Sequence, residues 1–246
     1  MRADLTRFGL TEMLRCGQGV RRSSANAPTF EDAAIAMNDY LYDALRDATD
    51  DRQLVLSRVY KTHPFNALES GQRAFADAML GGVPPSPALQ CLCLMATRGA
   101  EQDWNDRRLS REHVAIPLQS REQIERTPMV AGLLRQLGID AVQLVNPGPQ
   151  QLASLAGKTC NVFHVEHAVG SPDVPYQDFV ERYGVRSVLG FGGALPSNAL
   201  FVCVLFSRVP VDRSAADRFR GIALDVKSMF FRYDTASTFS ARPAGG

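Results

Sequence analysis

A group of cysteine and histidine residues beyond the middle of the chain has the types and spacing that metal chemistry requires. Cys160, His164 and His167 follow the pattern C-x3-H-x2-H. A thiolate and two imidazoles can hold Zn²⁺ and leave a fourth position open for water. His164 alone could also serve as an axial haem ligand. The alternative is a buried cysteine with histidines that only line a pocket or the surface, since no second cysteine pair supports a zinc site.

A second candidate for chemistry is the pair Cys91 and Cys93, two residues apart in an apolar stretch. On a strand these side chains point to the same face, as a thiol redox pair would require. The alternative is an ordinary buried strand, because same-side neighbours on one strand rarely have disulfide geometry. Both possibilities stay open at this point.

Aromatic and polar residues near the metal candidates could instead bind a small molecule. An apolar cavity with a few polar anchors is the usual form of such a site. His164 and Arg186 are the candidate anchors. The candidate lining residues are Phe163, Tyr176, Phe179, Tyr183 and Phe191. The alternative is that these rings simply pack in the core. Trp104 either shields part of such a pocket or lies half-buried in a charged loop.

Length and composition restrict the classes of function. The chain has 246 residues, of which 45% are hydrophobic and 22% charged, with a net charge of +1. That length favours one large domain with a sizeable core. A near-neutral charge excludes a global nucleic-acid footprint, and no apolar run is long enough to span a membrane. The odd number of cysteines, 5, and the lack of a signal-peptide pattern predict a reducing cytoplasm.

Hydrophobic periodicity and capping residues predict the elements that position these side chains. We expect an N-terminal helix within 1–15 and a linker to 27, a main domain over 28–232, and a disordered tail over 233–246. Within the main domain, helices are expected at about 30–47, 70–79, 128–136 and 215–231. Strands are expected at about 53–60, 89–97, 113–118, 160–165, 185–194 and 200–207, with 140–145 as a strand or a helix end and 146–149 as a turn. Thr29, Ser120 and Asp212 or Ser214 are expected to cap helices.

The last third of the chain carries the most specific pattern. The strand Arg186-Ser187-Val188-Leu189-Gly190-Phe191, a turn, the strand Leu200-Phe201-Val202-Cys203-Val204-Leu205-Phe206 and an amphipathic helix around Phe219 follow one another. This ending resembles the close of a GAF domain, in which a hairpin is followed by a helix that packs on the back of the sheet. Residues 160–191 also resemble the N-terminal sensory region of some bacterial sensor histidine kinases and cyclase-type signalling proteins.

The resemblance implies an α+β, GAF/PAS-like fold, a central antiparallel sheet with helices packed on it. It also implies a cytoplasmic, homodimeric bacterial module that senses a small ligand and signals through its first and last helices to a partner protein. Haem and zinc are possible cofactors, and neither nucleic acid nor a membrane is an expected partner. Two alternatives remain. One is a small thiol- or metal-dependent enzyme that uses Cys160 and His164 or the Cys91/Cys93 pair, and the other is an adaptor that kept the fold and lost the ligand.

Overall fold

The computed structural model describes residues 2–140, residue 145 and residues 160–241. They form an α+β fold around one six-stranded sheet in which all neighbouring strands pair antiparallel, in the order β3-β2-β1-β6-β5-β4. The strands are β1 (Leu54–Pro64), β2 (Gln90–Gly99), β3 (Ala115–Pro117), β4 (Asn161–Val165), β5 (Ser187–Ala194) and β6 (Leu200–Ser207). The fold class that the sequence predicts is confirmed.

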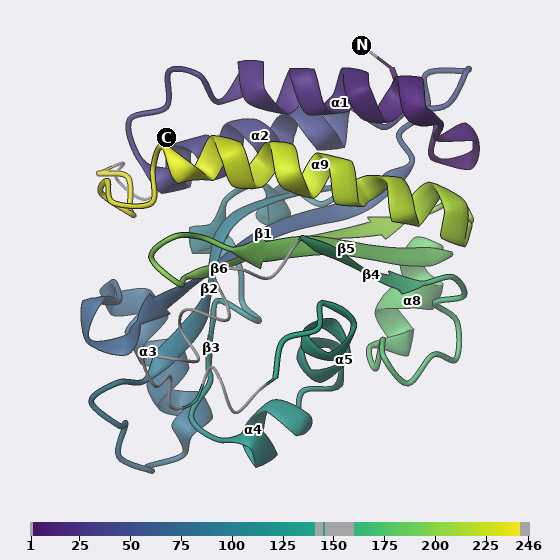
Figure 1. Cartoon of the computed structure of the whole chain (residues 1–246). Coiled ribbons are helices and arrows are strands. Elements are labelled where there is room, and N and C mark those ends of the chain that lie inside the picture. The colour runs from purple at the N-terminus through teal and green to yellow at the C-terminus, as the bar shows by residue number, and fades with distance from the viewer. Residues whose placement is uncertain (1, 141–144, 146–159, 242–246) are drawn as a thin grey trace.

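Helices cover both faces of this sheet (Figure 1). The upper face is the one covered by α1 (Leu10–Ser23), α2 (Phe30–Ala44) and α9 (Arg213–Phe231). The lower face is opposite, and α4 (Arg121–Glu125), α5 (Pro128–Gln136) and α8 (Gln177–Tyr183) pack there. The remaining elements are α3 (Ser70–Leu80), packed beside β3, and the short 3-10 turns η1 (Leu5–Arg7), η2 (Phe65–Ala67), η3 (Gln102–Asn105) and η4 (Arg107–Leu109).

The sheet is buried on both faces, which explains the continuous apolar run of β6. Phe201, Cys203 and Leu205 point into the upper core, and the residues between them point into the lower core. Strands covered on both sides lose the usual alternation of apolar and polar residues. The upper core also contains ring stacking between α9 and its neighbours, as between Phe30 and Phe230, whose centroids are 4.2 Å apart.

Local capping signals in the sequence are confirmed. The Thr29 hydroxyl accepts the Asp32 N–H at 3.1 Å and begins α2. Ser120 accepts the Gln123 N–H at 3.1 Å, and Asp212 accepts the Ala215 N–H at 2.7 Å. Each contact satisfies an amide that the helix itself leaves unpaired.

The N-terminal helix begins and ends later than the sequence suggests. The prediction of a helix within 1–15 followed by a polar linker is wrong in its bounds, because α1 covers Leu10–Ser23. The Glu12 carboxylate accepts the Gly9 N–H at 3.0 Å, which fixes the start of the helix there. Arg21 and Arg22 then lie in its last turn, where positive charge suits the helix dipole.

Other differences lie in the connections. The sequence predicts no helix between the strands expected at about 160–165 and 185–194, whereas the structure has α8 there. Phe231, the last residue of α9, is 64% exposed, because it is turned by about 120° from the buried Phe219 around the helix axis. The described part of the expected tail, to residue 241, lies against α2. Most of 140–145 and all of 146–149 lie outside the described residues.

No helix within the described ranges is both long and apolar enough to cross a membrane.

Candidate functional site

The structure does not bring the three predicted metal ligands together. Cys160 and His164 lie on the upper side of β4, as expected for positions four apart, but that spacing separates them by about 13 Å along the strand. The His164 Nε2 is 2.8 Å from the carbonyl oxygen of Val211, and His167 is exposed beyond the end of the strand. Among the described residues, no three His, Cys, Asp or Glu side chains are placed to hold a metal ion. The residues present fit neither the zinc site nor an axial haem ligand open to iron.

The predicted ligand-binding residues are divided between the two faces of the sheet. Phe191 lies in the upper core against Phe219, on the same face as His164. Phe163, the neighbour of His164 on β4, lies in the lower core. Arg186 is exposed at the start of β5, where only its backbone is bonded, to Ala168 and Ser207. The two polar anchors that the sequence suggests therefore do not converge.

Cys91 and Cys93 share a face of β2, as expected, and both are buried in the upper core. Burial raises the pKa of Cys91 to about 12 and raises that of Cys93 further above its ordinary range. Burial also raises the pKa of Cys160. Because the thiolate is the reactive form of cysteine, these three thiols are unsuited to nucleophilic or redox chemistry at neutral pH.

A different set of polar side chains converges on the lower face of the sheet. Arg58 on β1 and Thr97 on β2 are direct cross-strand partners. The Arg58 Nε and the Thr97 Oγ1 are both buried, and neither has a hydrogen-bond partner among the described residues. One Arg58 nitrogen lies 3.4 Å from the Tyr60 hydroxyl and 3.5 Å from the Glu112 carbonyl oxygen. Buried polar groups are nearly always paired, so two neighbouring exceptions within the described part of the chain single out this place as a candidate binding site.

His113 and Tyr176 stand beside this pair of strands. The His113 Nε2 is 2.8 Å from the Tyr176 hydroxyl, and the two rings meet edge to face. His113 has a φ of 58°, a left-handed conformation that is uncommon for a residue other than glycine. Burial and the nearby charge of Arg58 lower the pKa of His113, so its imidazole is neutral at pH 7. A neutral ring can accept one hydrogen bond and donate another.

Four aromatic rings form a wall next to the polar residues. Trp104 of η3 lies 4.8 Å from Tyr183 and 5.8 Å from Phe179, both on α8. Phe179 in turn contacts Phe206 of β6 edge to face at 5.3 Å. Phe206 is the partner of Leu56 on β1, two residues from Arg58, which places the wall on the same face of the sheet about 7 Å along the strand from Arg58.

The candidate site is therefore a guanidinium, a hydroxyl, a phenol and a neutral imidazole beside an aromatic wall. Of the residues expected from the sequence, Tyr176, Phe179, Tyr183 and Trp104 belong to the site or its wall, and Phe163 lies in the core of the same face. Sequence reasoning missed five residues, which are Arg58, Tyr60, Thr97, His113 and Phe206. The sequence did contain a signal for Arg58, because an arginine inside an apolar strand needs a partner to compensate for its burial.

No protein-family model matches this chain, and no curated protein sequence matches it. Solved structures do. The phycocyanobilin-bound GAF domain of a cyanobacterial phytochrome has 11% identity and a TM-score of 0.43, over 90% of this chain and 94% of that one. The GAF domain of an Acinetobacter phosphoenolpyruvate-protein phosphotransferase has 13% identity and a TM-score of 0.43, over 92% and 97%. The N-acylhomoserine lactone-dependent LuxR-family factor CepR2 from Burkholderia cenocepacia has 14% identity and a TM-score of 0.38, over 91% and 95%.

The chain has a GAF-like fold. This statement depends on its own architecture: three strands, helices, a fourth strand, a closing antiparallel hairpin and a last helix on the back of the sheet. The closing hairpin and the helix behind it are the part of this order that the sequence resemblance implies. The solved structures have TM-scores below 0.5, so they assign no ligand to this chain.

Proposed function

We propose that this protein is a small-ligand-sensing regulatory domain whose ligand binds on the lower face of the sheet, over Arg58 and Thr97. The observation that carries the proposal is a pair of buried polar atoms, the Arg58 Nε and the Thr97 Oγ1, that have no hydrogen-bond partner among the residues the structure describes. An unpaired buried group costs about 1–3 kcal/mol, and more when it is charged. A ligand that supplies an acceptor to both groups recovers that energy on binding.

The chemistry of the site selects the class of ligand. A guanidinium next to a hydroxyl suits a carboxylate or another oxygen acceptor. The neighbouring wall of Trp104, Phe179 and Tyr183 suits a ring or an alkyl chain attached to that acceptor. The ligand is therefore a small molecule with one anionic or carbonyl end and one apolar end.

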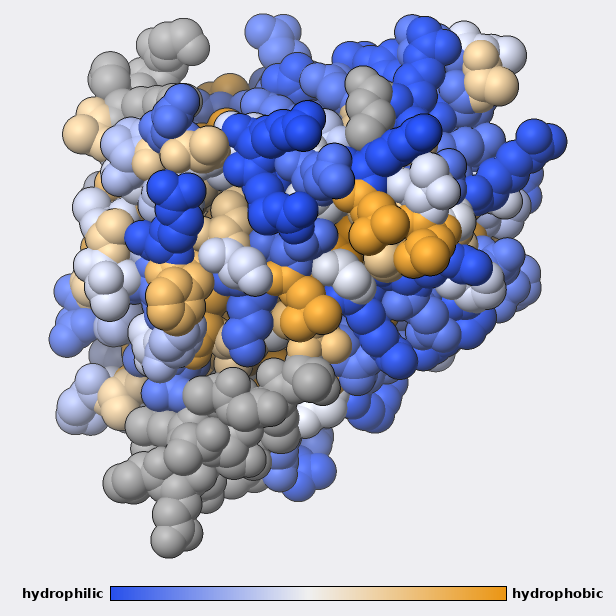
Figure 2. Space-filling view, turned by 45° about the horizontal axis from the view of Figure 1, so that its top comes forward, coloured by the Kyte–Doolittle hydropathy of each residue, from blue (hydrophilic) through white to orange (hydrophobic). Residues whose placement is uncertain are grey.

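The signal would leave the domain through its terminal helices, α1 and α9. These helices pack closely on each other, and Gly17 lets the Asp225 carboxylate approach the α1 backbone. Hydrophobic side chains lie among charged ones on this face (Figure 2). The most exposed are Leu10, Leu14, Leu224 and Phe231. We propose this face as the contact with a second copy in a homodimer or with a signalling partner, in a cytoplasmic bacterial system.

The thiol- or metal-dependent enzyme is the weaker reading of this structure. Its cysteines are buried with raised pKa values, and its predicted metal ligands lie apart. No observation on the described residues favours it over ligand binding.

The test is a thermal-shift screen of small carboxylates and carbonyl compounds, with mass spectrometry of any molecule released on denaturation. Two matched variants test whether the stabilisation depends on the proposed site. Arg58→Gln removes the buried anchor, and Arg186→Gln removes an exposed arginine elsewhere. A ligand at about 100 times its Kd stabilises the folded state by about 2.7 kcal/mol. We expect that stabilisation in the parent protein and in Arg186→Gln, and its loss in Arg58→Gln.

A compound that stabilises all three proteins equally would refute the assigned site. A screen in which no compound stabilises the parent protein would favour the adaptor hypothesis.

A further inference from the structure

The chain that follows α9 turns back over the start of α2. We call residues 234–241 the C-terminal strap. The Phe30 N–H donates to the Ser237 carbonyl oxygen at 3.1 Å, and the Glu31 N–H donates to the Thr238 carbonyl oxygen at 3.0 Å. The first amides of a helix have no partner within the helix. The strap supplies those partners and is held by them.

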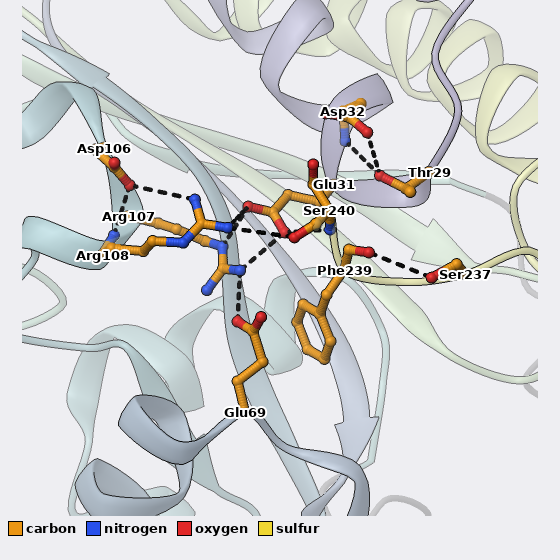
Figure 3. A network of polar contacts seen from close by, with 10 residues as sticks. All are labelled: Thr29, Glu31, Asp32, Glu69, Asp106, Arg107, Arg108, Ser237, Phe239 and Ser240. Carbon is orange, nitrogen blue, oxygen red and sulfur yellow. Dashed lines mark hydrogen bonds and ion pairs between the residues drawn. The ribbon is translucent and has the colours of Figure 1, made fainter. Parts of the chain in front are cut away.

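A buried ion pair holds the strap from the other side (Figure 3). Two Arg107 nitrogens contact the two Glu31 carboxylate oxygens at 2.7 and 2.8 Å, and Arg107 also contacts Glu69 at 2.6 Å. The Ser240 N–H donates to Glu31 at 2.9 Å. The guanidinium of Arg107 also lies 5.3 Å from the centre of the Phe239 ring. The strap is thus bonded to the same carboxylate that pairs with Arg107.

Arg107 belongs to a short connection after β2, residues 101–109, that also carries Trp104. The connection is tightly folded. The Asn105 side chain accepts the Gly99 N–H at 3.0 Å, and Asp106 accepts the Arg108 N–H at 2.8 Å. Only two residues, Asn105 and Asp106, therefore lie between the tryptophan on the aromatic wall of the candidate ligand site and the arginine that holds Glu31. A displacement at one end cannot be absorbed by a long flexible loop.

We propose that residues 101–109 couple the ligand site to the C-terminal strap. A ligand that displaces Trp104 moves Arg107 and changes how firmly Glu31 holds the strap. Because coupling between two sites is reciprocal, loosening the strap must also change the surroundings of Trp104. The inference rests on the proposed function only in naming the side of Trp104 as the place where a ligand acts.

The first experiment uses Trp104 as a reporter, since it is the only tryptophan of the chain. In the unliganded protein, Phe239→Ala removes the ring beside Arg107. We expect a red shift of Trp104 emission and stronger quenching by acrylamide. The control is Ser197→Ala, which removes a hydroxyl bonded to Asp234 at the start of the strap and leaves the contacts of the strap with Glu31 and Arg107 in place. It is expected to leave both readings unchanged.

The second experiment runs in the opposite direction, with hydrogen exchange of the strap contacts. Trp104→Phe should accelerate exchange of the Phe30, Glu31 and Ser240 amides by about fivefold or more, the lower end of typical couplings. Tyr176→Phe is the control, because it alters the candidate site without touching the connection. Unchanged amides in Trp104→Phe, or equal acceleration in both variants, would overturn the coupling.

Neither measurement uses a ligand, so each can succeed or fail independently of the ligand screen. If no compound stabilises the protein in the thermal-shift screen, the coupling between residues 101–109 and the strap can still be present as a mechanical property of the fold. If the strap amides do not respond to Trp104→Phe, the coupling is refuted, but the proposed ligand site at Arg58 is not.

Discussion

Removing the charge of Glu31 tests how much the buried ion pair contributes to the fold. Its side chain is fully buried, and that of its partner Arg107 is 4% exposed. Breaking one side of a buried pair costs about 3–5 kcal/mol, because the other charge is left uncompensated. Glu31→Gln leaves Arg107 with Glu69, which is partly exposed and 2.6 Å away. We therefore expect the lower end, a loss of about 3 kcal/mol in the free energy of unfolding.

Urea unfolding followed by far-UV circular dichroism measures this loss. For a chain of this size, about 3 kcal/mol corresponds to a fall of roughly 6–12 °C in Tm. Glu125→Gln is the matched control, because Glu125 pairs with Arg121 at 2.7 Å on an exposed helix surface. Exposed pairs of this kind contribute little, so its stability should not change measurably. A loss in Glu31→Gln no larger than that of the control would refute the reasoning.

Three further predictions follow from the cores and the site. Gly192→Ala should lower the free energy of unfolding by about 1–3 kcal/mol, because a Cβ there would lie 2.3 Å from the Phe201 carbonyl oxygen. Gly190→Ala should lower it less, because the nearest contact of a Cβ there is 3.3 Å. Urea unfolding of the two variants measures the difference. Because the pKa of His113 is lowered in the folded protein, the unfolded chain binds a proton at this imidazole more tightly. The free energy of unfolding should therefore fall as the pH drops through about 6.5, the ordinary pKa of histidine. His113→Asn should flatten that part of the curve of stability against pH. All five cysteines are buried, so DTNB should label none in the folded protein and all in urea; rapid labelling of any one in the folded state would contradict its placement.

The elements of the fold could be predicted because their signals are local. Thr29, Ser120 and Asp212 each bond an amide three residues onward, so the sequence alone contains both partners. The closing hairpin is also local, since β5 and β6 pair along their whole length across a short turn. The bounds of α1 were missed because Gly9 is capped by the side chain of Glu12, a less common signal than a Ser or Thr cap.

The candidate site could not be predicted because it is assembled across the sheet. Arg58 and Thr97 become neighbours only through the pairing of β1 with β2, and a register shift at Val59 helps to set which residues face each other. The sequence analysis also assigned His164 and Phe163 to the same ligand-binding site. Adjacent strand residues point to opposite faces, and in a sheet buried on both sides the pattern of apolar residues does not reveal which face is which.

A ligand bound at the candidate site would have to act across a sheet that is buried on both faces. The candidate site is below the sheet, and the terminal helices and the strap are above it. Strand β1 itself offers one route, since Arg58 points down while Ser57, its neighbour, points up and hydrogen-bonds Asn38 of α2. That route passes through the most tightly paired part of the sheet, where β1 is bonded on both sides. The connection at 101–109 passes around the edge instead, where the backbone has no sheet partners to break, so it can move at lower cost in free energy. The position of Trp104 and Arg107 on that connection is therefore the feature of the fold best suited to carry a signal between its two faces.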